Sequence, residues 1–310
     1  MSLMPWHATI ASRLERQFSD DHLGHALLLQ GPKGIGKQGL AAWLAGTILG
    51  IDSALMDDRL DEVSPDLIVV SPEEKKHTIS VNQIRGLSEK LTLSSHGPNG
   101  MVTIIEPAEQ MTIAAANALL KTLEEPVDQR WIILVTHDAA RLPATVLSRC
   151  ERITAAIPAF DDAATWLVSR GLDPADAEQA LHWTGGSPLQ ALALHEAGQI
   201  QALARLRSDL QGLLGGRGSA LQVATVAESL GFERSLETIR SVAIEAIRAE
   251  SGVEVGAASS FSGYVIDLPG LFCYLESLNR ATRLQPGSFN AELMLETLLI
   301  PWATGFRPAT

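Results

Sequence analysis

A glycine-rich segment near the start of the chain has the residue types and spacing of a phosphate-binding loop. Gly31-Pro32-Lys33-Gly34-Ile35-Gly36-Lys37-Gln38 matches the pattern G-x-x-x-x-G-K-[ST] at every position except the last. Glycines allow backbone N–H groups to surround phosphate oxygens, and the N-terminus of a following helix adds a favourable partial charge. Lys37 is spaced to reach the β and γ phosphates. These eight residues therefore predict a nucleotide-binding site.

Three positions of this predicted site are poorly suited to hydrolysis. Gln38 replaces the hydroxyl residue that would bind Mg²⁺. Glu106 stands where an aspartate would hold the metal, and its extra methylene displaces the carboxylate. Pro107 occupies the place of a water-activating glutamate, and proline accepts no proton. We expect ATP or ADP to bind without hydrolysis. The sequence does not decide whether Mg²⁺ binds with the nucleotide. The alternative for the loop is a structural role without nucleotide binding. The alternative for Glu106 and Glu109 is that both are ordinary solvated carboxylates.

The elements that must position this loop alternate between two types in the first half of the chain. Short apolar runs predict buried strands, and longer segments with apolar residues three or four apart predict helices. The strands are expected at 26–30, 67–70, 101–105 and 131–136, and the helices at 38–49, 81–93 and 113–124. Buried strands that alternate with helices are typical of a parallel sheet covered on both faces.

The pattern changes after about residue 155, where helical spacing replaces strand-like runs. Leu203, Leu206, Leu210 and Leu213 follow the i, i+3, i+4 rhythm of one long helix. Further helices are expected at 163–169, 174–183, 189–197, 221–230, 235–250, 268–278 and 291–299. The sequence predicts an α/β domain at 1–156, a small helical domain at 157–200 and a helical C-terminal domain at 201–310.

Composition narrows the class of protein. The chain has 310 residues, of which 46% are hydrophobic and 19% charged, an ordinary balance for a globular protein. Its net charge of −12 disfavours strong binding to DNA by the chain alone, because basic side chains dominate that affinity. Two cysteines, Cys150 and Cys273, exclude a disulfide framework and a four-cysteine zinc site. The start of the chain lacks the pattern of a secretory signal, so we expect a cytoplasmic protein.

Two further segments carry a specific resemblance. Residues 116–126 read Ala-Asn-Ala-Leu-Leu-Lys-Thr-Leu-Glu-Glu-Pro, and Leu147-Ser148-Arg149-Cys150 follows the fourth predicted strand. Together with the phosphate loop, these segments resemble the clamp-loader branch of the AAA+ ATPases. The resemblance covers roughly residues 4 to 190. It implies an α/β P-loop domain of RecA-like, AAA+ type, followed by a small helical lid and an all-α C-terminal collar domain.

The resemblance also implies roles for individual residues. Arg149 matches the arginine that reaches into the ATP site of a neighbouring subunit, which is called an arginine finger in trans. The alternative is that Arg149 pairs with a local carboxylate such as Glu151. Thr136 falls at the sensor-1 position, which faces the γ-phosphate, and could instead cap backbone at the strand end. Pro188 stands near the place of a sensor-2 arginine. The zinc module that many relatives carry has no counterpart in the acidic, cysteine-free segment 51–65, so we expect no zinc.

The function that the resemblance implies is that of a stator in DNA replication. The chain would join motor (tau or gamma) subunits and a delta subunit in a hetero-pentamer, which loads a sliding clamp on primed DNA as part of a DNA polymerase holoenzyme. It would complete a neighbour's ATP site through Arg149 without hydrolysing ATP itself. The alternatives are an active motor ATPase of the same assembly and a scaffold that binds no nucleotide.

Overall fold

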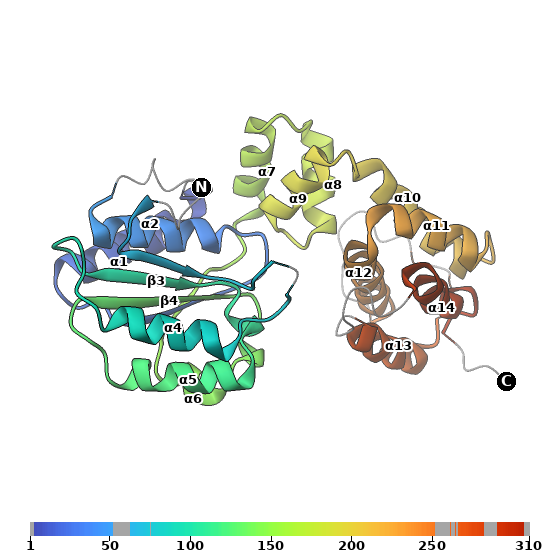
Figure 1. Ribbon diagram of the computed structural model, residues 1–310. Helices are drawn as coiled ribbons and strands as arrows, with labels where there is room; N and C mark the ends of the chain where they lie inside the picture. The colour runs from blue at the N-terminus through green and yellow to red at the C-terminus, as the bar shows by residue number, and fades with distance from the viewer. Residues whose placement is uncertain are drawn as a thin grey trace. The chain divides into compact units, whose positions relative to one another are not determined.

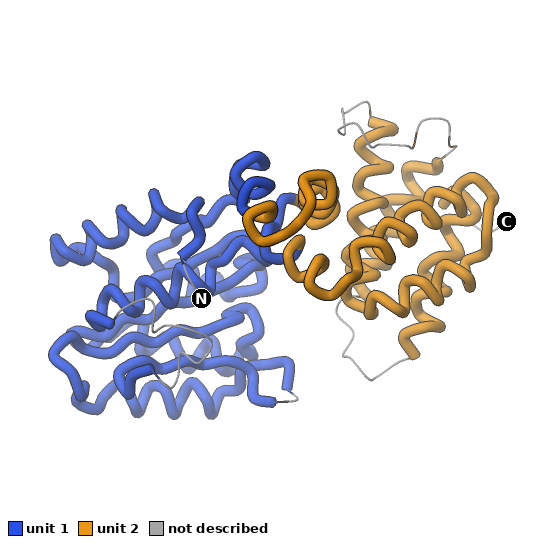
Figure 2. The backbone as a smooth tube through the Cα atoms, turned by 90° about the horizontal axis from the view of Figure 1, so that it is seen from above, with its two compact units in different colours: residues 1–166, 186–190 blue, residues 167–185, 191–310 orange. Residues whose placement is uncertain are grey.

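The computed structural model describes residues 3–51, 63–74, 76–251, 261, 264, 266–281 and 290–306. Contacts divide the chain into two compact units, shown in Figure 2. The first, which we call the α/β unit, contains residues 1–166 and 186–190, and the second, the helical unit, contains residues 167–185 and 191–310. The finer division into three domains stays a prediction.

The α/β unit is built on one parallel sheet, as the sequence predicts. Its strands are β1 (Ala26–Gln30), β2 (Leu67–Val70), β3 (Met101–Ile105), β4 (Arg130–Thr136) and β5 (Glu151–Thr154). They pair in the order β2-β3-β4-β1-β5, and every pair is parallel. The first four strands are confirmed to within one residue. The sequence analysis did not predict β5, a short strand at the edge of the sheet.

Helices cover both faces of this sheet (Figure 1). On one face lie α1 (Ala8–Ser19) and α2 (Lys37–Leu49), and on the other lie α4 (Val81–Leu91), α5 (Ile113–Glu124) and the short α6 (Ala144–Leu147). Successive residues of a strand point to opposite faces. Leu27 and Leu29 of β1 accordingly join the core under α1 and α2, whereas Ala26 and Leu28 join the core under α4 and α5. The predicted fold class is confirmed.

The parallel strands give this sheet two chemically different edges. The loops that follow Gln30, Ile105 and Thr136 leave the sheet on the same side, which we call the carboxyl edge. We call the other side the amino edge, where β4 begins at Arg130 and β5 begins at Glu151. Ligands of open parallel sheets bind beyond the carboxyl ends of the strands, so the phosphate loop lies where the fold favours a nucleotide.

The helical unit is confirmed to be made of helices in its described part. These are α8 (Pro174–Trp183), α10 (Ile200–Leu214), α11 (Ala220–Leu230), α12 (Phe232–Glu250), α13 (Leu268–Ala281) and α14 (Ala291–Ala303), while α7 (Phe160–Ser169) and α9 (Pro188–Glu196) span the boundary of the units. Leu203, Leu206, Leu210 and Leu213 of α10 are buried in one core with Tyr274 and Trp302. Tyr274 donates to the Leu298 carbonyl at 2.8 Å and accepts from the Trp302 indole at 3.0 Å. None of the described helices is long and apolar enough to span a bilayer.

Candidate functional site

The phosphate loop has the backbone form that an anion site needs. It leaves β1 at Gln30, passes through Gly34 and Gly36 with φ of +79° and +88°, and enters α2 at Lys37. Side chains at these two positions would be strained, and a Cβ on Gly36 would lie 2.5 Å from Met4 Cγ. The first amides of α2 have no acceptor within the helix. The loop therefore retains the N–H groups that could face a phosphate.

The carbonyl side of the same loop is fully engaged by the chain's own groups. Lys37 Nζ donates to the carbonyls of Gly31 and Pro32 at 2.7 and 2.6 Å. The next three carbonyls, of residues 33 to 35, accept from Ser187 Oγ at 2.5 Å, from the Leu189 amide at 3.0 Å and from the Trp6 indole at 2.8 Å. Five consecutive carbonyls are thus satisfied. The lysine predicted to reach phosphate is folded back onto its loop with 4% of its surface exposed.

Glu109 forms a buried polar cluster beside this loop. It lies on the 3-10 turn η3 (Ala108–Gln110), and its side chain is 2% exposed. Thr136 Oγ1 donates to Glu109 Oε2 at 2.7 Å, and His137 Nε2 lies 2.8 Å from Oε1. Burial raises the pKa of Glu109, but the hydrogen bonds from His137 and Thr136 outweigh it and lower the pKa on balance. Glu109 is therefore an internal carboxylate, and the solvated alternative is wrong for it.

This cluster also uses the hydroxyl of Thr136. The side chain is fully buried, its one proton is donated to Glu109, and its oxygen accepts from the Asp138 amide at 3.1 Å. The sequence analysis did not identify Glu109 and His137 as partners. A signal was present, because an acid shortly after β3 and the pair Thr136-His137 after β4 must meet where adjacent parallel strands end.

Burial shifts the pKa values of Lys37 and of two ionisable groups near it. Burial lowers the pKa of Lys37 to about 8, although Glu106 and Glu109 raise it in part. Burial raises the pKa of Glu106 to about 7, against the effect of Lys37 and His137. The pKa of His7 falls to about 4 because of burial and the nearby Lys37. A carboxyl group that is half neutral near pH 7 is a weak ligand for Mg²⁺.

Arg149 lies at the opposite edge of the sheet. It follows α6, two residues before β5 begins at the amino edge. Its Nη1 donates to the Thr145 carbonyl at 2.9 Å and to Ser148 Oγ at 3.3 Å, and its Nη2 forms an ion pair with Glu124. The alternative, a pair with a carboxylate of the same chain, is therefore observed, but the partner is Glu124, 25 positions upstream, and the example Glu151 is wrong.

The predicted site residues thus form two groups. The phosphate loop, Glu106 and Thr136 gather at the carboxyl edge, whereas Arg149 stands alone at the amino edge. Within the described residues, no three His, Cys, Asp or Glu side chains are arranged to hold a metal. Most of the acidic segment 51–65 lies outside the described residues.

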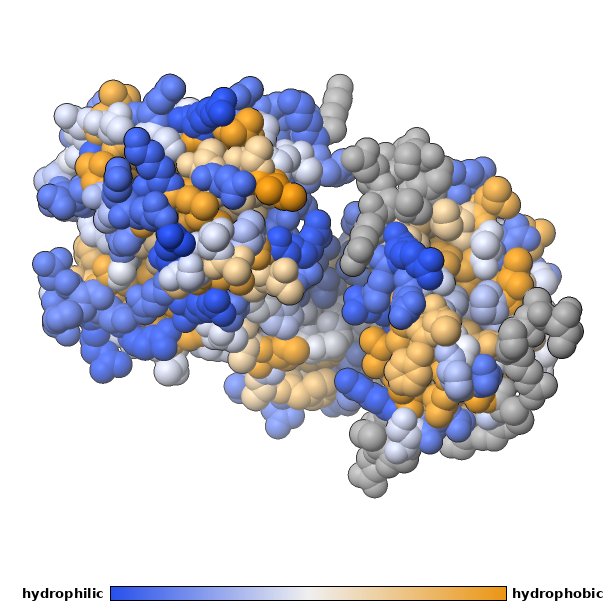
Figure 3. Space-filling model, turned by 90° about the horizontal axis from the view of Figure 1, so that it is seen from below, coloured by the Kyte–Doolittle hydropathy of each residue, from blue (hydrophilic) through white to orange (hydrophobic). Residues whose placement is uncertain are grey.

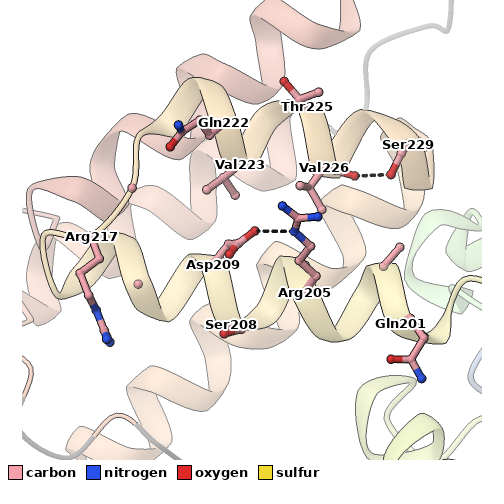
Figure 4. A pocket seen from close by; sticks show the side chains of 13 residues that line it. Gln201, Arg205, Ser208, Asp209, Arg217, Gln222, Val223, Thr225, Val226 and Ser229 are labelled. Carbon is pink, nitrogen blue, oxygen red and sulfur yellow. Dashed lines mark hydrogen bonds and ion pairs between the residues drawn. The ribbon is translucent and has the colours of Figure 1, made fainter.

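The helical unit contains a hollow that is a different kind of surface. A groove of about 1030 Å³ runs between α10 and α11 (Figure 4). Arg205 and Asp209, one turn apart on α10, form an ion pair at 3.8 Å on one wall of the groove, and Ser229 Oγ on α11 donates to the Val226 carbonyl at 2.6 Å. The groove is open and its charged side chains are exposed, so nothing in it resembles the buried cluster at the carboxyl edge.

Comparison with known proteins identifies the family. A family model described as "DNA polymerase III, delta subunit" matches residues 6–157. The DNA polymerase III subunit delta' of Pseudomonas aeruginosa is 30% identical over 324 residues, which cover 97% of this chain and 98% of that protein. The subunit of the same name from Escherichia coli is 34% identical over 212 residues, covering 65% and 64%.

A solved structure agrees in fold. The DNA polymerase III gamma subunit-related protein of Thermotoga maritima superposes with a TM-score of 0.53 at 18% identity, over 96% of this chain and 99% of that one. At this identity the likeness concerns the fold alone. Because the similarity to a delta' subunit extends over nearly the whole length of both proteins, the chain belongs to the delta' family of clamp-loader subunits of DNA polymerase III.

Proposed function

We propose that this chain is a non-hydrolysing stator that donates Arg149 in trans to the ATP site of a neighbouring clamp-loader subunit. A guanidinium at such a site stabilises charge that develops on the transferred phosphoryl group. The chain would thereby complete a catalytic site that another subunit binds and closes. Coupling between the two subunits would depend on one exposed side chain.

The position of Arg149 across the sheet from its own phosphate loop is the observation that carries this proposal. Strand β1 pairs with β5 in parallel, with Leu27 opposite Glu151 and Gln30 opposite Thr154. The phosphate loop follows Gln30, whereas Arg149 precedes Glu151, so the length of the paired strands, about 10 Å, separates the two edges. The guanidinium is held on the far side by Thr145 and Glu124. It is therefore suited to another chain's phosphate and not to its own.

The loss of hydrolysis is supported by the carboxyl edge. Gln38 supplies no hydroxyl for Mg²⁺, and Pro107 supplies no base. Glu106 is only weakly acidic in this environment. The one hydroxyl proton of Thr136 is committed to Glu109. With these residues at the four positions, the described part of the site offers no group suited to activate a water or to hold a metal.

Whether nucleotide binds at all separates two versions of the proposal. The free amides of the first turn of α2 favour binding of ATP or ADP without hydrolysis. The two short bonds from Lys37 to Gly31 and Pro32 favour the second version, a scaffold that binds no nucleotide. An active motor ATPase has no such observation in its favour.

The partners that we propose are those of a clamp loader. Motor subunits of tau or gamma type and a delta subunit would complete a cytoplasmic hetero-pentamer, which acts on a sliding clamp and primed DNA. The collar would form through the helical unit, where Leu293 and Ile300 of α14 are exposed seven positions apart. Figure 3 shows hydrophobic residues gathered on the face of this unit that it presents, between hydrophilic ones.

Substitution of Arg149 in the reconstituted complex tests the trans role. Arg149→Ala should leave assembly unchanged and reduce steady-state ATP turnover by on the order of 10³ if it acts as a full arginine finger. Arg152→Ala is the matched control, because Arg152 is exposed on the neighbouring strand β5 and its guanidinium bonds only weakly to the Leu147 carbonyl. Equal turnover in the two variants would refute the role of Arg149.

A further inference from the structure

The ion pair at the amino edge joins two segments that are distant in sequence. Glu124 is the last residue of α5, and Arg149 follows α6. Both side chains reach the surface, where Arg149 is 34% exposed and Glu124 is 49% exposed. The contact therefore places the C-terminus of α5 against Arg149, the residue that the proposed function assigns to a neighbouring subunit's ATP site.

The location of Glu124 is unfavourable for a carboxylate unless a cation accompanies it. The C-terminus of a helix carries a partial negative charge from its unpaired carbonyls, and an acidic side chain there is repelled. Arg149 supplies the compensating charge by direct contact. Glu125 follows at the same helix end and is also exposed, but its side chain has no such ion pair among the described residues. The two adjacent glutamates thus differ in their relation to Arg149.

The contacts of Arg149 hold the side chain but do not use all of its hydrogen-bond donors. A guanidinium has five N–H donors in a rigid plane. The bonds to Thr145, Ser148 and Glu124 involve Nη1 and Nη2 and take at most three donors. The donor on Nε and one on Nη2 remain for an oxygen that approaches from outside. The guanidinium is held by three partners and has two donors left that could bind a phosphate oxygen.

We propose that Glu124 is a positioning residue for Arg149. Its carboxylate would hold the guanidinium in the orientation that meets a neighbour's phosphate, so that less side-chain freedom is lost when the two subunits close. Pre-organisation of this kind raises the rate because the catalytic group need not be ordered at the moment of reaction. This inference rests on the proposed trans role of Arg149.

The expected effect is modest because the pair is exposed to solvent. Interactions between exposed ions are screened and individually weak. Glu124→Gln should lower the rate constant of ATP hydrolysis in a single turnover of the reconstituted complex about three- to fivefold. The KM for ATP should be unchanged, because the arginine acts in the transition state. Added salt should narrow the difference from wild type.

The experiment compares wild type with four variants in the full complex. Glu124→Gln is measured beside Glu125→Gln, which removes the same charge one residue away and should retain the wild-type rate. Arg149→Ala and the double variant Glu124→Gln/Arg149→Ala complete a double-mutant cycle. If Glu124 acts through Arg149, its substitution should cost nothing further in the double variant. Thermal unfolding of each chain checks that all four are folded.

Each possible failure has a distinct signature. If Arg149→Ala hydrolyses ATP at the wild-type rate, the proposed function fails and this inference fails with it. If Arg149→Ala is impaired but Glu124→Gln matches Glu125→Gln, only the role of Glu124 is overturned. A loss from Glu124→Gln that persists in the Arg149→Ala background would also overturn it, since the carboxylate would then act through the structure of α5.

Discussion

The two edges of the same sheet are organised in opposite ways. At the carboxyl edge, Lys37, Glu109 and Thr136 are buried, and their polar atoms are bonded to groups of the chain itself. At the amino edge, Arg149 and Glu124 are partly exposed, and the guanidinium retains donors for another molecule. The first edge is the usual nucleotide site of the fold. The second carries the arginine that we propose to act on a partner.

Under the proposed function, the nucleotide fold is kept although its own site does not hydrolyse ATP. The loop, strands and helices that would position a phosphate are all present, so the scaffold that supports Arg149 is intact. Side chains at the carboxyl edge serve to close and stabilise that edge. The proposed trans role of Arg149 and the stability of the fold therefore depend on different residues of the α/β unit, and each can be tested by itself.

The largest expected difference between the edges is in stability. Glu109→Ala would leave the buried Thr136 hydroxyl and His137 without their acceptor, which should destabilise the α/β unit by about 2–3 kcal/mol. Glu124→Ala, at the exposed edge, should change the free energy of unfolding by less than about 0.5 kcal/mol. Urea unfolding of the full-length variants measures both values. Similar losses at the two positions would contradict the contrast between a structural and an available carboxylate.

A smaller effect should appear in the pH dependence of Glu106. Because burial raises its folded-state pKa from an ordinary 4.5 to about 7, its contribution to stability is fully present below about pH 4.5 and is lost as the pH rises through 7. Glu106→Gln removes this loss. The variant should match wild type near pH 4 and exceed it at pH 8 by on the order of 1 kcal/mol.

The comparison at pH 4 is the control for this variant, since the carboxyl is then mostly protonated in both the folded and the unfolded state and carries the same charge as the amide. Thermal unfolding at both pH values provides the measurement. A stability difference that is equal at pH 4 and pH 8 would mean that burial does not raise the pKa of Glu106, and would restore it as a candidate metal ligand.

Much of the framework could be predicted from the sequence because it depends on local patterns. Buried strands such as 101–105 are continuous apolar runs, and the helix at 113–124 was predicted with both of its ends. Strand β5 was missed for a physical reason. It is a four-residue edge strand in which Ile153 is the one buried side chain, so it lacks both a run and a clear alternation.

The contacts of the site could not be predicted in the same way, because they join distant segments. Glu109 meets Thr136 and His137 across 27 and 28 positions, and Arg149 meets Glu124 across 25. Sequence spacing suggested Glu151 for Arg149, but Glu151 accepts from Gln17 instead. Such partners follow from strand order and helix ends, which the local pattern does not contain.

Steady-state hydrolysis of ATP by the purified chain alone, with Mg²⁺ present, tests the central claim most directly. Lys37→Ala, prepared in the same way, measures the contribution of contaminating ATPases. We predict that wild type shows no turnover above this variant, because Gln38, Glu106 and Pro107 leave the carboxyl edge without hydrolytic groups. Turnover that Lys37→Ala abolishes would contradict the account and make this chain a motor subunit.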